Sequence, residues 1–334
     1  MKYYNIPIFV AHEGCPFQCV FCNQKRITGM DTSATPEIVT DTIKEYLHTI
    51  PEGEKRIEAA FFGGSFTGIS EEKQIALLDA AYEFVKSGEI DGIRLSTRPD
   101  YISEEILDRL KSFGVTTVEL GVQSMDDGVL MASGRGHTAK TVIEAVGLIK
   151  KYPFKLGLQM MLGLPGDTPE KSVLTAKRII GLNPDFVRIY PTLVLKDTYL
   201  EKMYEKGEYK ALSVAETVDI LKRILPMFYE NGIEVIRVAL AVTEEISPDG
   251  ALVAGPFHPA IRELAEGEIY YDKICKMLES DGSLRAFSVN GSEISKALGN
   301  GRRNAERIKE KYGFEIKIKP SDALKKGEIT AWKE

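Results

Sequence analysis

The chain of 334 residues contains few cysteines and no long run of apolar residues. Its apolar segments are all shorter than the roughly 18 residues that cross a bilayer, which excludes a membrane-spanning helix and any membrane partner. The chain has only four cysteines, and three of them lie close together. This number and spacing do not suit a disulfide framework. We therefore expect the protein to be located in the reducing cytoplasm. Internal repeats and low-complexity segments are also lacking, which leaves an ordinary globular fold.

Negative charge is in excess but unevenly distributed. The net charge is −6, whereas residues 296–334 contain 11 Lys/Arg and 6 Asp/Glu, which makes this tail +5 and the preceding 295 residues −11. An acidic body is poorly suited to a long polyanion, whose binding depends on neutralising its phosphates. This favours a small-molecule substrate over tRNA. The basic tail could contact a phosphate or a partner, or it could be only a solvated terminal helix.

Three cysteines, Cys15, Cys19 and Cys22, have the spacing C-x3-C-x2-C. Thiolate is a soft ligand, and closely spaced cysteines on one loop suit zinc or an iron–sulfur cluster. A structural zinc site needs four protein ligands, and the fourth cysteine, Cys275, lies far along the chain in an amphipathic stretch. Three local thiolates favour a four-iron cluster in which one iron is left open to chelate a small molecule. Zinc or structural thiols are the alternative.

Short β-branched segments alternate with longer amphipathic segments from residue 1 to about 240. Strands are expected at 6–10, 57–62, 93–97, 116–121, 155–162, 186–191 and 233–237, and helices near 36–48, 71–87, 103–113, 138–151, 168–181 and 213–230. This alternation calls for a parallel sheet with helices outside it. Six or seven units are too few for a closed eight-stranded barrel. We therefore expect an α/β fold with a partial (β/α)6-type TIM barrel, and a doubly wound open sheet is the alternative.

Residues 241–334 follow a different pattern and predict a small C-terminal α/β cap. The stretch from Glu244 to Pro259 is rich in Pro, Gly and Asp, which indicates a loop. Helices are expected at 259–279 and 292–311, and a short strand at 314–319. These patterns predict a barrel core over residues 1–240 and a cap over residues 241–334.

Polar residues and paired glycines follow several of the predicted strands. In α/β barrels the loops after the strands build the site, so these residues should line one mouth. Gly63 and Gly64 would let a ligand approach the backbone closely, and an arginine such as Arg135 suits a carboxylate. Each candidate also has a plain structural explanation, such as a surface salt bridge or a satisfied buried amide. The other polar candidates at strand ends are Ser65, Ser96, Arg98, Gln123, Gln159 and Tyr190.

Together these features resemble the radical S-adenosylmethionine (SAM) superfamily, whose hallmark is this cysteine spacing with an aromatic residue, here Phe21, before the third cysteine. The segments 97–100, 119–124 and 135–138 are similar to one branch, which contains the catalytic subunit of Elongator and the oxygen-independent coproporphyrinogen oxidases. The resemblance covers about residues 5–270. It implies a 4Fe–4S cluster, S-adenosyl-L-methionine as cofactor, and a reducing electron donor such as flavodoxin or ferredoxin.

The resemblance also implies roles for single residues. The three clustered cysteines would bind the cluster, Phe21 would touch the adenine, and Arg135 would hold the methionine carboxylate. Gly63 and Gly64 would receive the methionine amino group, beside Ser65, where many relatives have an acidic residue. Ser96, Gln123 and Gln159 would lie near the ribose or the methionine, and Arg98 is a further cofactor-site candidate.

The implied reaction is the reductive cleavage of SAM, followed by abstraction of hydrogen from a substrate carbon. Among short relatives the chain is most similar to queuine lyase, so we expect a lyase that acts on a modified nucleobase in queuosine salvage. His258 and Tyr190, in segments expected to cover the barrel mouth, are the catalytic candidates. Radical modification of a tRNA nucleoside and a non-catalytic iron–sulfur sensor are the alternatives. Acetyl transfer to tRNA is not expected, because the acetyltransferase domain of Elongator would require a much longer chain.

Overall fold

The computed structural model describes residues 2–10, 15, 19–23, 34–240, 246–247 and 249–332. The chain forms two compact units, which are residues 1–212 with 227–256, and residues 213–226 with 257–334. The domain boundary expected at residue 240 remains a prediction. Most of the cysteine-bearing segment, and Glu244 in the expected loop, lie outside the described residues.

In the described part of the chain, no helix combines the length and the apolar character needed to cross a membrane.

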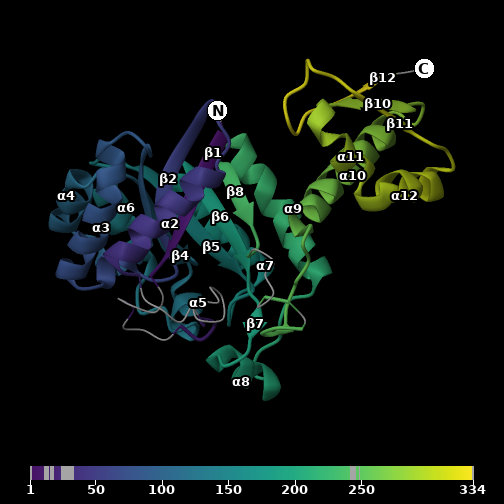
Figure 1. Ribbon diagram of the computed structural model, residues 1–334. Coiled ribbons are helices and arrows are strands. Elements are labelled where there is room, and N and C mark those ends of the chain that lie inside the picture. Colours follow the sequence, from purple (N-terminus) through teal and green to yellow (C-terminus); the bar gives the residue numbers. More distant parts are fainter. Residues whose placement is uncertain are drawn as a thin grey trace. The chain divides into compact units, whose positions relative to one another are not determined.

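Seven parallel strands form one curled sheet in the larger unit, in the order β1-β2-β3-β4-β5-β6-β8 (Figure 1). The strands are β1 (Lys2–Phe9), β2 (Lys55–Phe62), β3 (Gly92–Thr97), β4 (Val115–Gln123), β5 (Lys155–Leu162), β6 (Phe186–Pro191) and β8 (Glu234–Val238). Each predicted strand is present within a few residues, and the partial TIM-type barrel is confirmed. Because every strand runs the same way, the carboxyl ends of all seven lie at one edge of the sheet.

Helices connect these strands, as the amphipathic segments predicted. They are α2 (Pro36–Thr49), α3 (Glu71–Lys86), α4 (Glu104–Ser112), α5 (Asp127–Ala132), α6 (Ala139–Ile149), α7 (Pro169–Gly181), α8 (Tyr199–Glu205) and α9 (Val214–Glu230). The side chain of Thr35 accepts a hydrogen bond from the first turn of α2, and Thr168 does the same for α7. Each helix then continues with a proline, which fits the first turn because that position needs no N–H donor.

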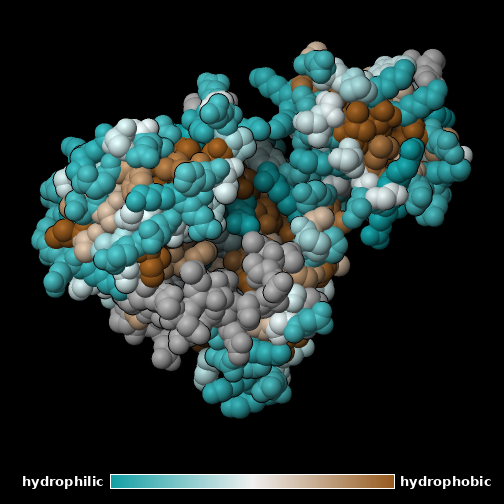
Figure 2. Space-filling model, in the orientation of Figure 1, coloured by the Kyte–Doolittle hydropathy of each residue, from teal (hydrophilic) through white to brown (hydrophobic). Residues whose placement is uncertain are grey.

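The sheet is buried on both faces, as parallel sheets require. Ile6, Ala59, Leu95, Leu158 and Ile189, each from a different strand, are fully buried. Hydrophilic residues cover most of the surface in Figure 2, except for hydrophobic patches that include one on the C-terminal unit. The buried strands fix the positions of the residues at their ends, which is what a binding site in this fold needs.

The smaller unit packs three helices against a three-stranded sheet. The helices are α10 (Ile261–Ser280), α11 (Ile294–Leu298) and α12 (Arg303–Tyr312), and the sheet has the order β11 (Lys317–Pro320), β10 (Ala286–Val289), β12 (Ile329–Trp332). The single helix expected at 292–311 is wrong, because Gly299 and Gly301 have φ values of +76° and +61°, which end α11. A separate two-stranded sheet pairs β7 (Val194–Leu195) with β9 (Leu252–Ala254) in the larger unit.

Candidate functional site

The cysteine segment is anchored at Val20, the residue that follows Cys19. The backbone N–H of Val20 donates to the carbonyl of Ser133 at 3.1 Å, and the Val20 carbonyl accepts from the N–H of Leu200 at 2.7 Å. Phe21 packs against a buried cluster that includes Val20 and Leu200. Cys15 is exposed, Cys19 is buried and Cys22 is intermediate between them. This anchoring places Cys19 next to the turn that follows α5.

Arg135 connects this segment to the end of β4. Its buried guanidinium donates from Nη1 to Cys19 Sγ at 3.3 Å, from Nη2 to the Gly121 carbonyl at 2.6 Å, and from Nε to His137 Nε2 at 3.4 Å. These bonds use three of the five N–H donors of a guanidinium. Arg135 therefore holds the Cys19 sulfur close to the end of β4.

Arg98 adds a second positive charge near the cysteines. Its guanidinium forms a two-pronged ion pair with Asp100, at 2.9 Å for each bond, and also donates to the Arg135 carbonyl. Burial alone would lower the pKa of Arg98, but Asp100 and negative charge on Cys15 and Cys19 favour the protonated form, so its pKa is raised. Arg98 therefore holds the Arg135 backbone and contributes positive charge beside two of the three sulfurs.

Ser65 and Thr97 bind each other where β2 and β3 end. Their hydroxyl oxygens lie 2.9 Å apart, and the Arg98 N–H donates to Ser65 Oγ at 3.3 Å. Ser65 is 1% exposed, so its contacts are with the protein. Gly63 has a φ of +92°, a conformation that favours glycine, and Gly64 follows it in the same bend. Roles for Gly63, Gly64 and Ser65 in cofactor binding remain predictions.

Gln123 has two unusual features at the end of β4. Its φ is +65°, in the left-handed region that is rare for residues other than glycine. Its side-chain Oε1 is buried and accepts no hydrogen bond from any residue that the structure describes. Strained backbone and unsatisfied buried acceptors are both found at functional sites. A ligand that donates to Gln123 Oε1 would satisfy it.

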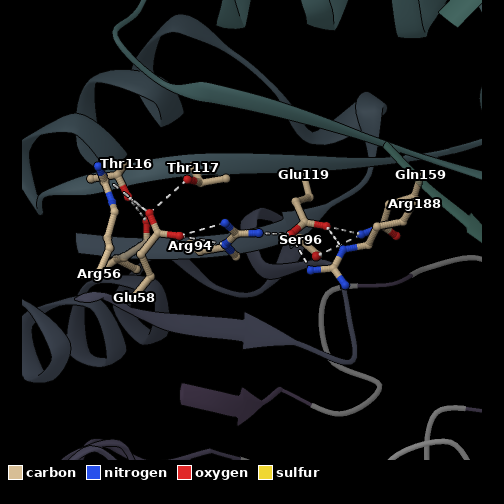
Figure 3. Close-up of polar contacts among 10 residues, drawn as sticks. Arg56, Glu58, Arg94, Ser96, Thr116, Thr117, Glu119, Gln159 and Arg188 are labelled. Carbon is tan, nitrogen blue, oxygen red and sulfur yellow. Dashed lines mark hydrogen bonds and ion pairs between the residues drawn. The ribbon is translucent and has the colours of Figure 1, made fainter. Parts of the chain in front are cut away.

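A network of buried charges crosses the sheet below these strand ends (Figure 3). Arg94 of β3 donates to Glu58 of β2 at 2.9 Å and to Glu119 of β4 at 2.9 Å. Arg188 of β6 binds both oxygens of Glu119, at 2.7 and 3.1 Å. Glu119 is fully buried and accepts bonds from both arginines, which compensates its charge. The charge is negative on β2, positive on β3, negative on β4 and positive on β6, with the neutral Gln159 on β5 between the last two.

The network also positions Gln159 and Ser96, two cofactor-site candidates. The amide nitrogen of Gln159 donates to Glu119 Oε2 at 2.9 Å and to Ser96 Oγ at 3.3 Å. Because both amide hydrogens are used, the orientation of the side chain is fixed and its carbonyl oxygen points away from this pair. Gln159 is only half-buried, so this oxygen can accept a bond from a ligand. The structure thus brings together Ser96 and Gln159, as expected.

Sequence reasoning missed the carboxylates and arginines of this network. The available signal was a charged residue inside a predicted strand, as at Glu58, Arg94, Glu119 and Arg188, which are all buried. A charge in the middle of a fully buried strand needs a partner of opposite sign on a neighbouring strand. These positions therefore indicate that buried ion pairs exist, but not which charges pair.

The two catalytic candidates belong to different units of the chain. Tyr190 lies on β6, and burial raises the pKa of its hydroxyl, against the opposing effect of Arg188. His258 lies just before α10, where its Nδ1 accepts from the Ala260 N–H at 3.1 Å. Arg262 pairs with Glu266 at 3.1 Å. Catalytic roles for Tyr190 and His258 remain predictions.

The donor set of the cysteine segment fits an iron–sulfur cluster. Three sulfurs on one short segment supply soft ligands, and Arg135 donates a hydrogen bond to that of Cys19. Among the described residues, no three His, Cys, Asp or Glu side chains already converge as a metal site. Nearby, Gln123 Oε1 and the remaining N–H groups of Arg135 are suited to the polar groups of a cofactor.

The stability of the barrel should depend on pH through His137. Burial, and then the charge of Arg135, lower the pKa of His137 to about 4, whereas Asp100 acts in the opposite direction. Its folded-state pKa lies below the unfolded value of 6.5, so the contribution to stability is complete above pH 6.5 and is lost as pH falls toward 4. The loss should be about 3 kcal/mol. Urea denaturation of wild type and His137→Asn between pH 7 and 4 measures it.

The His137→Asn variant should show a flatter pH dependence over this range. His48→Asn, at an exposed position on α2, serves as the matched control and should follow wild type. Equal slopes for wild type and His137→Asn would show that His137 is protonated in the folded protein well above pH 4.

Comparisons with known proteins identify the family. The Radical SAM superfamily model matches residues 9–179, and the Radical_SAM C-terminal domain model matches residues 184–271. An uncharacterized protein of Methanocaldococcus jannaschii is 30% identical over 239 residues, which are 67% of this chain and 73% of that protein. The tRNA uridine(34) acetyltransferase of the same organism is 28% identical over 269 residues, 68% of this chain and 50% of that protein. Human Elongator complex protein 3 is 31% identical over 241 residues, 66% of this chain and 43% of that protein.

Solved structures share the fold. The archaeal Elp3 of Methanocaldococcus infernus has a TM-score of 0.61 and 22% identity, and the match covers 94% of this chain and 68% of that one. Coproporphyrinogen III oxidase of Escherichia coli has a TM-score of 0.50 and 18% identity, over 69% of this chain and 52% of that one. The chain spans about half the length of the acetyltransferases that it matches. With the cysteine segment, the partial barrel and the family match in agreement, this chain belongs to the radical SAM superfamily, and its cofactors are a 4Fe–4S cluster and S-adenosylmethionine.

Proposed function

We propose that this radical SAM enzyme modifies a nucleoside of tRNA. The observation that carries the proposal is the similarity, over 68% of this chain, to a protein named tRNA uridine(34) acetyltransferase. The similarity to Elongator complex protein 3 lies in the same direction. Acetyl transfer is not part of the proposal, because this chain matches only about half of those relatives.

The residues around Cys19 would hold the cofactors. Cys15, Cys19 and Cys22 would bind three irons, and the bound cluster with SAM would supply a radical that removes hydrogen from a substrate carbon. Arg135 keeps two N–H donors for the methionine carboxylate while its other donors hold Cys19 and the end of β4. Gln123 Oε1 would accept a bond from the ammonium group or a ribose hydroxyl.

An external protein would supply the electron. Cys15 is exposed, so a cluster bound there would lie near the surface, where a small donor such as flavodoxin or ferredoxin could reduce it. Burial of Cys19 and its contact with Arg135 would shield the opposite side from water.

A free modified base is the second candidate substrate, and one observation favours it. Residues 1–295 have a net charge of −11, which opposes binding of a long polyanion to the barrel. With such a substrate the enzyme would be a queuine lyase that acts in queuosine salvage, as we expected from the sequence. The relatives described above favour tRNA over it, since two of them are named for tRNA uridine and for Elongator.

Release of 5′-deoxyadenosine from the reduced, reconstituted enzyme distinguishes the candidates. Bulk tRNA lacking the modification should accelerate release, and the effect should weaken steeply between low and moderate salt because phosphates are neutralised on binding. The same tRNA digested to nucleosides is the control and should have little effect. Acceleration by free queuine, with none by intact tRNA, would select the small-molecule candidate instead.

A further inference from the structure

The small sheet of the C-terminal unit has one packed face and one open face. Side chains alternate along each strand, so Phe287, Val289, Ile318 and Ile329 point toward the helices, where they join two hydrophobic clusters with residues of α10, α11 and α12. Figure 1 shows these helices on one side of β10, β11 and β12. The opposite side, which we call the open sheet face, carries Ser288, Lys317, Lys319, Thr330 and Trp332.

Trp332 belongs to the edge strand β12, and its side chain reaches the middle strand β10. Its backbone pairs with Ala286 of β10, its indole Nε1 donates to Ser288 Oγ at 3.2 Å, and Lys319 Nζ lies 4.3 Å from the ring centroid. Ala286 is fully buried although it belongs to the open face, which shows that it is covered. The ring is half-buried and Lys319 lies over it, so a stacked base would take the place of the lysine there.

The open sheet face is also positively charged. Lys317 and Lys319 are exposed. They are two residues apart on one strand, so their side chains lie on the same side of the sheet, about 6.6 Å apart. No acidic residue occupies this face in the described strands, and residues 296–334 together have a net charge of +5. An occupant should therefore combine spaced negative charges with a flat ring. Single-stranded nucleic acid has both, whereas an acidic peptide or a lipid headgroup offers only charge.

We propose that the open sheet face binds a single-stranded loop of tRNA, with one base stacked on Trp332 and its phosphates beside Lys317 and Lys319. This rests on the proposed function and extends it, because it gives an otherwise acidic chain a separate docking site for RNA. It also gives the basic tail a function other than solvation. Unpaired bases are available for such stacking in loops but not in duplex RNA.

Fluorescence tests the proposal directly, because Trp332 is the only tryptophan of the chain. Titration of the reconstituted holoenzyme with a tRNA transcript should quench the tryptophan emission in a saturable, salt-dependent manner. A twelve-nucleotide single-stranded RNA should quench it, and the same length of duplex should not. Unchanged emission at saturating tRNA, with binding shown by filter retention, would overturn the proposal.

Variants separate stacking from charge. Trp332→Ala should weaken tRNA binding about tenfold, and Trp332→Phe should retain affinity within about threefold because an aromatic face remains. Lys319→Gln should weaken binding and reduce its salt dependence, whereas Lys276→Gln, an exposed charge on α10 of the same unit, should not. Equal effects of the two lysine changes, or full competition by polyglutamate, would indicate general attraction and reject stacking on Trp332.

The same variants distinguish this inference from the proposed function. If tRNA stimulates 5′-deoxyadenosine release equally in wild type and Trp332→Ala, at subsaturating tRNA, stacking on Trp332 is rejected and tRNA modification stands. If tRNA neither quenches Trp332 nor stimulates wild type, both are rejected. Quenching without stimulation keeps the RNA site and rejects tRNA as the substrate.

Discussion

Alanine in place of Cys15, Cys19 or Cys22 should leave the anaerobically reconstituted protein with almost none of the roughly four irons expected in wild type. A cluster bound by three thiolates cannot be held by two, because the remaining iron coordination would be open to solvent and exchange. Cys19→Ala should have the largest effect, since it also removes the sulfur that accepts from Arg135. Iron and sulfide analysis, with the charge-transfer absorption of the cluster, measures the loss.

Cys275→Ala is the matched control and should keep full iron content. Cys275 is buried in α10, in the other compact unit, beside Tyr271 and Tyr312. Removing its sulfur should reduce the stability of that unit through lost packing contacts, without reducing the iron content. Loss of iron in this variant would reject a cluster with three protein ligands and would reopen the zinc alternative.

Glu119→Gln should destabilise the barrel by about 3–5 kcal/mol. The two oxygens of Glu119 accept four bonds, from Arg94, Arg188 and Gln159. An amide at this position directs its own N–H donors at arginine donors and leaves two buried guanidinium groups without a carboxylate between them. Urea denaturation followed by circular dichroism should show the loss, and Gln159 should lose its fixed orientation.

Glu71→Gln provides the comparison for this substitution. Glu71 also pairs with an arginine, Arg109, at 2.7 Å, but its side chain is 61% exposed. Water screens an exposed pair, so the change should be within about 1 kcal/mol. A similar loss in both variants would mean that the buried network contributes no more than a surface ion pair.

The order of strands and helices in the barrel could be predicted because local patterns and tertiary structure agree there. Thr35 before Pro36, for example, predicts the start of α2, and the structure begins the helix at Pro36. The C-terminal unit was harder to predict. Strands β10 and β12 are four residues each, too short for a period to show, and β10 becomes a strand only by pairing with both neighbours.

Part of the candidate site could likewise be predicted from the sequence, and part could not. The cysteine spacing and the residues at strand ends were visible in the sequence, and the structure brings Cys19 to Arg135 and Ser96 to Gln159. What could not be predicted depends on register across several strands. Glu119 meets Arg188 only because β4, β5 and β6 align as neighbours, although the two residues are 69 positions apart.

The buried charges also have an evolutionary consequence. Loss of Glu119 leaves Arg188 without a carboxylate, and loss of Glu58, Arg94 or Arg188 removes one ion pair from a partner buried in a medium of low dielectric constant, so single changes at these positions should be rejected. Only coordinated replacements would be tolerated. The four strands that carry these charges would then diverge as a set, while the loops beyond them could change one residue at a time. Such a scaffold could acquire new substrates without moving the residues that hold its cofactor.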